Sequence, residues 1–290
     1  MKVLVIGATG MLGYSIFSNL SESPNLDVYG TVRSVNGLER FFPSTNKLIF
    51  NVDIKDFDTL ECAVRATKPN IVINCIGLIK QYEASKQYVE AIEINALLPH
   101  KIAQLCDTLG TRLIHFSTDC VFDGKTGNYV DSDLPTATDL YGKSKHLGEV
   151  GYGKHLTLRT SIIGHELKSS VSLIDWFLSQ EGSVKGFSKA VFSGLPTAYV
   201  AKVLVDYVLP NPSLSGLYHL SVDPIDKYSL ISKVSEIYSK QVEIEKCEDF
   251  VIDRSLDSTK FCKETGFVPP NWDDLIKFMH CDYSKRYDNE

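Results

Sequence analysis

Short apolar segments alternate with longer amphipathic segments through the first 160 residues of the chain. The short segments are runs rich in Val, Ile and Leu, while the longer ones repeat their apolar positions with the spacing of a helix. This alternation is typical of βα units on a parallel sheet that carries helices on both faces. The predicted strands cover residues 2–6, 27–32, 47–50, 71–74, 112–116 and 156–160.

The predicted helices lie between these strands, at residues 11–20, 57–67, 88–109 and 141–151. Pro99 falls inside the third helix, where it removes a backbone donor and clashes with the preceding turn, so we expect a break or a kink there. After Arg159 the alternation ends. The later elements are predicted helices at 173–178, 197–208, 229–238 and 272–279 and a strand at 217–221.

This order of elements predicts an α/β fold, a Rossmann-type doubly wound parallel sheet with a small C-terminal α/β lid. We expect residues 1–165 to form the Rossmann domain, with 192–212 returning to it. Residues 166–191 and 213–290 are expected to form the smaller region, which would bind the substrate.

Composition and charge restrict the classes of function. The 290 residues, 43% of them hydrophobic, suffice for a large core. The net charge of -6 and the absence of a long basic run give no sign of a nucleic-acid or membrane surface. Because no apolar run has the length of a signal or membrane-spanning segment, we expect a cytoplasmic protein. The seven cysteines lack C-x-x-C spacing and no acidic or His cluster has ligand spacing, so we expect no disulfide framework and no metal.

A glycine-rich turn follows the first predicted strand and opens the first helix. Its spacing is G-x-x-G-x-x-G, which differs from the commonest dinucleotide fingerprint, G-x-G-x-x-G. Such a turn lets the backbone approach a pyrophosphate, while the helix N-terminus offers free N–H donors. Ordinary turn and packing glycines are the alternative, but the position directly after a strand favours a dinucleotide site. The residues expected to bind the cofactor here are Gly7, Thr9, Gly10, Met11, Leu12 and Gly13.

The end of the second strand bears on the type of cofactor. A site for NAD usually places an acidic residue there to hold the ribose 2′-OH, but this chain reads G-T-V-R at 30–33. Arg33 is suited to a 2′-phosphate, so we expect NADP rather than NAD, with a solvated arginine as the alternative. Asp53 and Ile54, after the third strand, are candidates for holding the adenine, unless Asp53 only terminates the strand.

Tyr141 and Lys145 are four residues apart, so they share one face of a helix. A cation beside a phenol stabilises the phenolate and lowers the pKa of the tyrosine, which then serves as a proton donor at working pH. This spacing alone is common by chance. Ser117 and Thr118 strengthen the case, since they close the fifth strand at the sheet edge where open α/β sheets bind ligands.

These elements together resemble the extended short-chain dehydrogenase/reductase family. The segments S-T-D-C-V-F-D-G at 117–124 and Y-G-K-S-K-H-L-G-E at 141–149 resemble its dTDP-4-dehydrorhamnose reductase branch. The resemblance implies that Thr118 hydrogen-bonds the substrate carbonyl and that Tyr141 protonates it, with Ser117 as the alternative hydroxyl. Lys145 would lower the tyrosine pKa and hold the nicotinamide ribose.

The same resemblance implies further contacts. Cys75, Ile76 and Gly77, after the fourth strand, would line the cofactor, and Asn95 matches a helix asparagine of the family. Asp119, next to Thr118, is also expected to contact the substrate. Lys80 follows the fourth strand, where it is a candidate for binding sugar or phosphate oxygens, with a solvated loop lysine as the alternative. Two departures from the branch concern the substrate and the lid. Ile162 stands where the branch usually has tryptophan, and a serine follows Arg254 where it tends to have proline.

The reaction expected from this resemblance is reduction of a 4-keto group on a nucleotide-linked 6-deoxysugar by NAD(P)H, as in deoxysugar and cell-surface polysaccharide biosynthesis. Elimination is disfavoured because Cys120 replaces the acid of the dehydratases. An epimerase-reductase using Cys120 and His165, an NDP-sugar epimerase and a non-catalytic NAD(P)-binding regulatory subunit remain alternatives. The expected partner is the nucleotide sugar, with a homodimer as a further possibility.

Overall fold

The computed structural model describes residues 1–78 and 87–288, and its centre is a seven-stranded sheet in the order β3-β2-β1-β4-β5-β6-β11. Every neighbouring pair in this sheet is parallel. The order reverses between β1 and β4, which is the switch point of a doubly wound sheet. The strands are β1 (Lys2–Ile6), β2 (Asp27–Thr31), β3 (Leu48–Ile49), β4 (Ile71–Asn74), β5 (Arg112–Thr118), β6 (Leu156–Thr160) and β11 (Gly216–His219).

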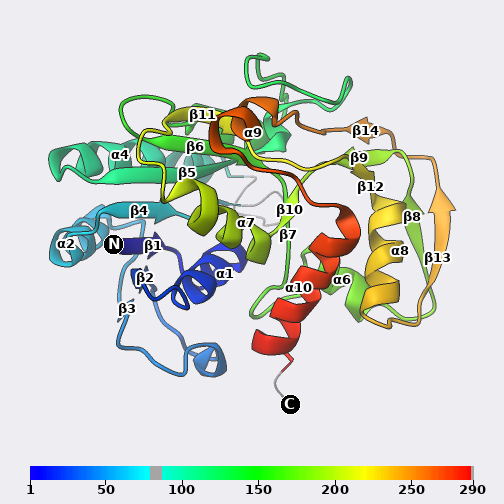
Figure 1. Ribbon diagram of the computed structural model, residues 1–290, viewed down its shortest axis with the longest axis horizontal. Helices are drawn as coiled ribbons and strands as arrows, with labels where there is room; N and C mark the ends of the chain where they lie inside the picture. Colours follow the sequence, from blue (N-terminus) through cyan, green and yellow to red (C-terminus); the bar gives the residue numbers. More distant parts are fainter. Residues whose placement is uncertain (79–86, 289–290) are drawn as a thin grey trace.

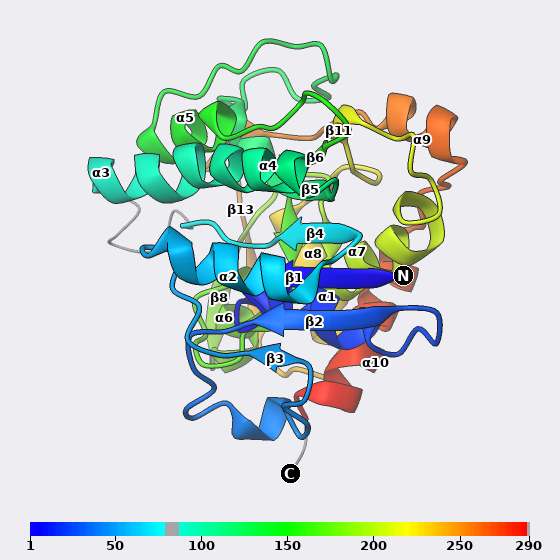
Figure 2. The ribbon, with the colours of Figure 1, turned by 90° about the vertical axis from the view of Figure 1, so that its left-hand side faces the viewer.

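Helices cover both faces of the sheet (Figure 2). Successive side chains of a strand point to opposite faces. Val3 and Val5 therefore join the core of one face, while Leu4 and Ile6 join the core of the other. The first face is covered by α1 (Met11–Leu20) and α7 (Thr197–Val203), the second by α2 (Phe57–Thr67) and α4 (Leu98–Thr108). The predicted Rossmann-type fold is confirmed.

The helix predicted at 88–109 is interrupted near Pro99. It consists of α3 (Tyr88–Ala91), a π-helical segment η3 (Ile92–Leu97) and α4, in which Pro99 occupies the first turn. A first-turn position tolerates the missing N–H of proline. The disturbance therefore lies in the wider π turn that precedes Pro99, and this turn contains Asn95.

The strand near residue 217 belongs to the large sheet rather than to the smaller region in which the sequence placed it. β11 pairs with β6 and forms the edge of the sheet. Its first residue, Gly216, has a φ of +94° and donates its N–H to His155 O, so the chain turns directly into the sheet at this point.

The smaller region lies beside the carboxyl ends of the strands and contains two small sheets (Figure 1). One has the order β12-β9-β14, and in the other β8 pairs in parallel with β13.

Within the described ranges, no helix has both the length and the apolar character needed to cross a bilayer. The remaining elements are η1 (Glu39–Phe41), η4 (Asp119–Val121), α5 (Leu140–Leu147), β7 (Ile162–Ile163), α6 (Leu173–Ser179), β8 (Ser183–Phe187), β9 (Ala190–Phe192), β10 (Leu195–Pro196), η5 (Leu204–Val208), β12 (Ile225–Asp226), α8 (Lys227–Ile237), β13 (Glu243–Cys247), β14 (Ile252–Asp253), α9 (Thr259–Thr265) and α10 (Trp272–Arg286).

Candidate active site

The glycine turn has the geometry of a phosphate cradle. Gly7 has a φ of +84°, which favours glycine, and a Cβ on Gly13 would lie 2.0 Å from Gly7 O. The first helix therefore starts in direct contact with the end of β1. Gly10 is its N-cap and makes no side-chain capping hydrogen bond, so the first turn of the helix keeps N–H groups for a ligand. The side chain of Leu12 is buried in the core, which leaves its backbone as the part available to a ligand.

Two of the residues expected to bind the cofactor, Arg33 and Asp53, differ in whether their side chains already have a hydrogen-bond partner. Arg33 is exposed just after β2, and its side chain makes no hydrogen bond with any described residue. The Asp53 carboxylate accepts a hydrogen bond from Lys55 N at 3.0 Å, so it forms a local turn after β3. Arg33 is thus available to a phosphate, whereas Asp53 already has a structural partner.

The end of β5 and the start of α5 bring Thr118, Tyr141 and Lys145 together. The Thr118 hydroxyl donates to Asp119 Oδ1 at 3.1 Å and is near enough to the Tyr141 phenol to affect its pKa. Lys145 is buried, and its Nζ donates to Phe116 O at 2.7 Å. Helix α5 approaches the β5 end closely because Gly142 has no side chain, and a Cβ there would lie 2.2 Å from Cys120 O. These three residues therefore form one cluster, as the sequence predicted.

The protonation of Tyr141 differs from the expectation. Burial raises the pKa of Tyr141, the nearby Cys120 thiol raises it further, and the Thr118 hydroxyl lowers it in part. Lys145 is not among the groups that lower the pKa of Tyr141. Burial lowers the pKa of Lys145 itself to about 8, against a smaller effect of Glu149 that raises it. The phenol consequently keeps its proton at neutral pH, which is the form that a proton donor needs.

Asn95 links three elements of the site. Its Oδ1 accepts from Leu78 N at 2.8 Å, and its Nδ2 donates to Leu78 O and to Ser144 Oγ, both at 3.2 Å. Both amide N–H groups are thus used within the protein. The resemblance implied a cofactor contact for Asn95, but its hydrogen bonds show it fastening α5 and the segment after β4 to the π turn. Gly77 lies between these parts, since a Cβ on it would be 3.6 Å from Lys145 Nζ.

Ser117 points away from this cluster. Its Oγ donates to Glu149 Oε1 at 2.7 Å, and Glu149 forms a two-pronged ion pair with Arg159 at 2.7 and 2.8 Å. Both side chains of the pair are nearly buried, with exposed fractions of 6% and 4%. Ser117 is therefore part of a structural network below α5, and Thr118 is the hydroxyl on the side of Tyr141.

Four further side chains surround the end of β5, and the sequence signalled only two of them as site residues. Asp119 is buried, and Cys120 contacts Arg254, whose Nη1 lies 3.7 Å from its Sγ. Lys227, at the start of α8, interacts electrostatically with Asp119 and Cys120. Arg254 and Lys227 were missed as site residues because they come from the smaller region. The smaller region therefore contributes two basic side chains to the surroundings of Asp119 and Cys120.

The segment around Arg254 is hydrogen-bonded to the part of the chain that follows η4. Asp253 N donates to Gly124 O at 2.8 Å, and Arg254 Nε donates to Phe122 O at 2.9 Å. Ser255 Oγ accepts from Asn128 N at 2.7 Å, and Ser255 N donates to Asp253 Oδ1 at 2.9 Å. A proline at this position could not make either Ser255 bond, so the departure from the branch has a structural use here.

The candidate base His165 and a second histidine, His115, are both bound in the core. His165 Nδ1 lies 2.6 Å from Asp175 Oδ1 and its Nε2 lies 2.9 Å from Tyr238 OH, at the junction of α6, α8 and α10. His115 is fully buried on β5, with Nδ1 3.2 Å from Asn74 Nδ2. Burial moves the pKa of His115 well below its usual value, so it stays neutral.

Lys80 lies outside the described residues.

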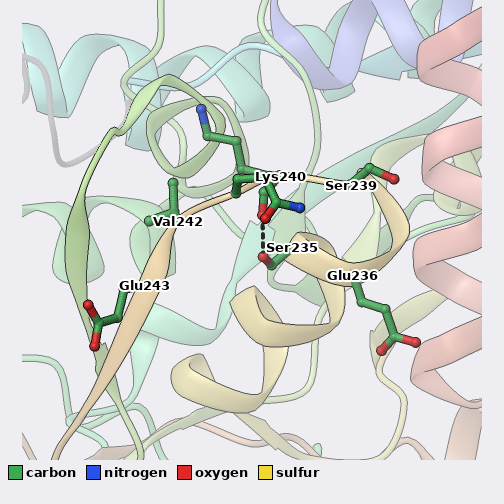
Figure 3. Close-up of a pocket in the computed structure, with 7 residues that line it drawn as sticks. Ser235, Glu236, Ser239, Lys240, Val242 and Glu243 are labelled. Carbon is green, nitrogen blue, oxygen red and sulfur yellow. Dashed lines mark hydrogen bonds between the residues drawn. The ribbon is translucent and has the colours of Figure 1, made fainter.

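Two surface depressions occur away from the catalytic cluster. One, of about 600 Å³, lies where α8 turns into β13 (Figure 3), and Ser235 Oγ donates there to Lys240 O at 2.7 Å. The other, of about 820 Å³, lies between β11 and α9. Neither is lined by a residue of the catalytic cluster.

Residues 1–283 match the family model described as the RmlD substrate binding domain. A relative from Danio rerio named methionine adenosyltransferase 2 subunit beta is 27% identical over 253 residues, which cover 82% of this chain and 74% of the relative.

Two solved structures have the same fold. A dTDP-4-dehydrorhamnose reductase from Bacillus anthracis in complex with NADP is 20% identical, with a TM-score of 0.79 over 97% of this chain and 99% of the other. A hypothetical dTDP-4-dehydrorhamnose reductase from Sulfolobus tokodaii is 25% identical, with a TM-score of 0.77 over 94% of this chain and 98% of the other.

Proposed function

The chain belongs to the RmlD substrate binding domain family, and on this premise we propose that it is an NAD(P)H-dependent reductase of a 4-keto group on a nucleotide-linked 6-deoxysugar. The observation that carries the proposal is the cluster of Thr118, Tyr141 and Lys145 at the carboxyl end of β5. In a doubly wound sheet this edge, next to the switch point, is where ligands bind.

The residues present fit a nicotinamide dinucleotide. The close contact at Gly13 and the uncapped first turn of α1 suit a pyrophosphate, and exposed Arg33 suits a 2′-phosphate. NADP is therefore the preferred cofactor and NAD the second. When bound, the cofactor supplies the hydride that goes to the carbonyl carbon.

The side chains of the chain itself supply orientation and the proton. The Thr118 hydroxyl lies beside the Tyr141 phenol, so one carbonyl oxygen can contact both. Tyr141 then donates its proton to that oxygen as negative charge develops on it. Lys145 is held by Phe116 O one helical turn from Tyr141 and keeps a positive charge near the reaction below about pH 8.

The epimerase-reductase alternative has less support. It needs Cys120 and His165 as an acid and base pair, but burial raises the pKa of Cys120 to about 12. His165 is bound by Asp175 and Tyr238. The two side chains are thus committed to other contacts, and Thr118 and Tyr141 remain as the reacting hydroxyls.

The name of the Danio rerio relative suggests a second candidate function, that of a subunit in a larger enzyme. A binding subunit has no chemical need for a proton donor, whereas this chain keeps Tyr141 near the Thr118 hydroxyl and one helical turn from buried Lys145. This arrangement favours the reductase. Turnover by the purified chain alone decides between the two functions.

The test is oxidation of NADPH and NADH, followed at 340 nm, with a panel of nucleotide-linked 4-keto-6-deoxysugars. We expect turnover with NADPH, lost in Tyr141→Phe while cofactor binding persists. Tyr207→Phe is the matched control, because the Tyr207 hydroxyl makes no hydrogen bond with a described residue. Tight cofactor binding without turnover of any of these sugars would refute the reductase and favour the subunit.

A nucleotide sugar as the partner, a cytoplasmic location and a homodimer complete the proposal. The apolar face formed by α3 and the start of η3 supports the dimer, since Tyr88, Val89 and Ile92 are 71%, 67% and 48% exposed. We expect Val89→Glu to convert a dimer to a monomer in light scattering after size exclusion. A wild-type chain that is already monomeric at micromolar concentration would refute it.

A further inference from the structure

A segment that leaves the large sheet after β6 returns to the loop that follows β2. We call residues 164–172, which join β7 to α6, the strap. Lys168 lies in the middle of the strap, and its Nζ donates a hydrogen bond to Asn36 O in the loop after β2. In the sheet, β5, β4 and β1 separate β6 from β2. The strap therefore connects two distant places on the carboxyl edge of the sheet.

The length of the chain restricts the path of the strap. Neighbouring strands lie about 4.8 Å apart, so four strand steps from β6 to β2 amount to about 19 Å. The chain from the end of β6 at Thr160 to Lys168 spans at most about 28 Å when it is fully extended. Little length is left for a detour, so the strap crosses the ends of the intervening strands by a short path.

The strap also lies close to the start of α1. The ring centroids of His165, in the strap, and Tyr287 are 5.4 Å apart, and those of Tyr287 and Tyr14 are 5.6 Å apart. Tyr14 belongs to the first turns of α1, directly after the glycine turn. The loop after β2 carries Arg33. The strap thus runs beside the residues that suit the pyrophosphate and ends at the loop that suits the adenosine.

The base of the strap is held firmly by the smaller region. Both ring nitrogens of His165 have partners, a carboxylate of α6 at 2.6 Å and a tyrosine hydroxyl at the end of α8 at 2.9 Å. Glu166 Oε2 accepts hydrogen bonds from Val171 N at 2.7 Å and from Ser172 N at 3.0 Å. These bonds close residues 166–172 into a compact loop that is fixed to α6 and α8.

The other side of the strap is held less firmly. Lys168 is exposed, and the hydrogen bond to Asn36 O is its contact with the loop after β2. The neighbouring Leu167 is only partly buried against the core of the face that α1 covers. An exposed hydrogen bond and a partly buried side chain are typical of a segment that opens locally at low cost. We therefore expect the strap to open at Lys168 and to stay attached at His165 and Glu166.

We propose that the strap closes over the bound dinucleotide and that Lys168 holds it closed, so that cofactor release requires the contact between Lys168 and Asn36 to break. Lys168 is a positioning residue, because it acts through Asn36 O rather than through the cofactor. The proposal rests on the cofactor of the proposed function but not on its sugar substrate. Since Asn36 O is a backbone atom that belongs to the protein, NADPH and NADH should be retained alike.

The test is stopped-flow release of the reduced cofactor from the full chain. The chain is loaded with NADPH or NADH and mixed with an excess of the oxidised form, and the loss of bound-nicotinamide fluorescence gives the rate of release. Lys168→Met keeps the stem and removes the donor, whereas Lys168→Arg keeps a donor. Lys185→Met is the matched control, because Lys185 is an exposed lysine on β8 of the same smaller region.

We expect Lys168→Met to release both cofactors about three- to tenfold faster, the usual effect of losing one hydrogen bond. Lys168→Arg and Lys185→Met should release them at the wild-type rate. The urea midpoint of Lys168→Met should equal that of wild type, because the side chain is exposed. Hydrogen exchange of residues 166–172 should slow when NADPH binds to wild type and should slow less in Lys168→Met.

The proposal is overturned if Lys168→Met releases both cofactors at the wild-type rate. It is also overturned if the release of NADPH alone becomes faster, since Lys168 would then bind the 2′-phosphate directly, or if the chain binds neither cofactor. The outcome is separate from that of the sugar panel. Faster release from Lys168→Met without turnover of any sugar keeps the strap and refutes the reductase, whereas turnover with unchanged release does the reverse.

Discussion

The ion pair between Glu149 and Arg159 offers a sharp test of how the catalytic helix is held. Their side chains are 6% and 4% exposed and are joined by contacts of 2.7 and 2.8 Å. Ser117 Oγ also donates to this carboxylate, and Ser117 is the neighbour of Thr118. The variant is Arg159→Met, which keeps a long apolar stem and leaves the carboxylate with two side-chain partners, Ser117 and the half-exposed His146 imidazole 3.0 Å from Oε2.

The expected loss in the free energy of unfolding follows from the Glu149 carboxylate that remains buried. Loss of one partner of a buried pair usually costs about 3–5 kcal/mol, because an uncompensated charge stays in the interior. A domain of this kind is stable by about 5–15 kcal/mol, so the variant should fold but unfold at much lower denaturant. The double variant Glu149→Gln/Arg159→Met leaves no buried charge at this position. We expect it to be more stable than Arg159→Met alone.

Urea unfolding followed by circular dichroism measures all four members of this cycle. The Arg159 guanidinium holds the pKa of Glu149 below its ordinary range, despite burial that raises it. The pair therefore stabilises the protein at neutral pH, and this contribution is lost as the pH falls through the lowered pKa of Glu149. The reasoning is refuted if Arg159→Met costs under about 1 kcal/mol, or if the two single changes simply add.

Three further predictions concern the site. Gly13→Ala should abolish NADPH binding, measured by fluorescence titration, since its Cβ would meet Gly7 O at 2.0 Å; retained affinity would contradict the cradle. The turnover rate should fall as the pH rises through about 8, when Lys145 loses its proton, and exposed Lys143→Gln should leave this limb of the pH profile unchanged. Asn95→Ala should lower kcat and destabilise the fold by about 1–3 kcal/mol, because Leu78 and Ser144 lose buried partners; stability equal to wild type would exclude that role.

The parts of the site that could be predicted are those fixed by local sequence. The spacing of Tyr141 and Lys145 places them on one helix face, and the parallel sheet puts the end of β5 beside them. Lys227 and Arg254 have no such signal, because the strands before them contain only two residues each. Strands so short show no periodicity, and their partner β9 lies far away in the sequence.

The sequence predicted a lowered pKa for Tyr141, but the structure gives a raised one. The spacing to Lys145 suggested a cation that lowers the pKa, but burial and the Cys120 thiol outweigh any such effect in this structure. Burial depends on how α5, η4 and the smaller region pack, and none of this is visible in a five-residue pattern. Asn95 shows the same limit, since its partners lie 17 and 49 residues away.

The raised pKa of Tyr141 also bears on the direction of the reaction. Reduction begins with the phenol protonated and ends with the proton on an alkoxide, which is a far stronger base than a phenolate. A raised pKa therefore keeps the Tyr141 phenol protonated without preventing transfer of its proton to the alkoxide. An epimerase must first remove a proton from a sugar hydroxyl, which needs a phenolate, and the packing around Tyr141 makes this form scarce. The raised pKa of Tyr141 thus matches the protonated phenol from which reduction starts.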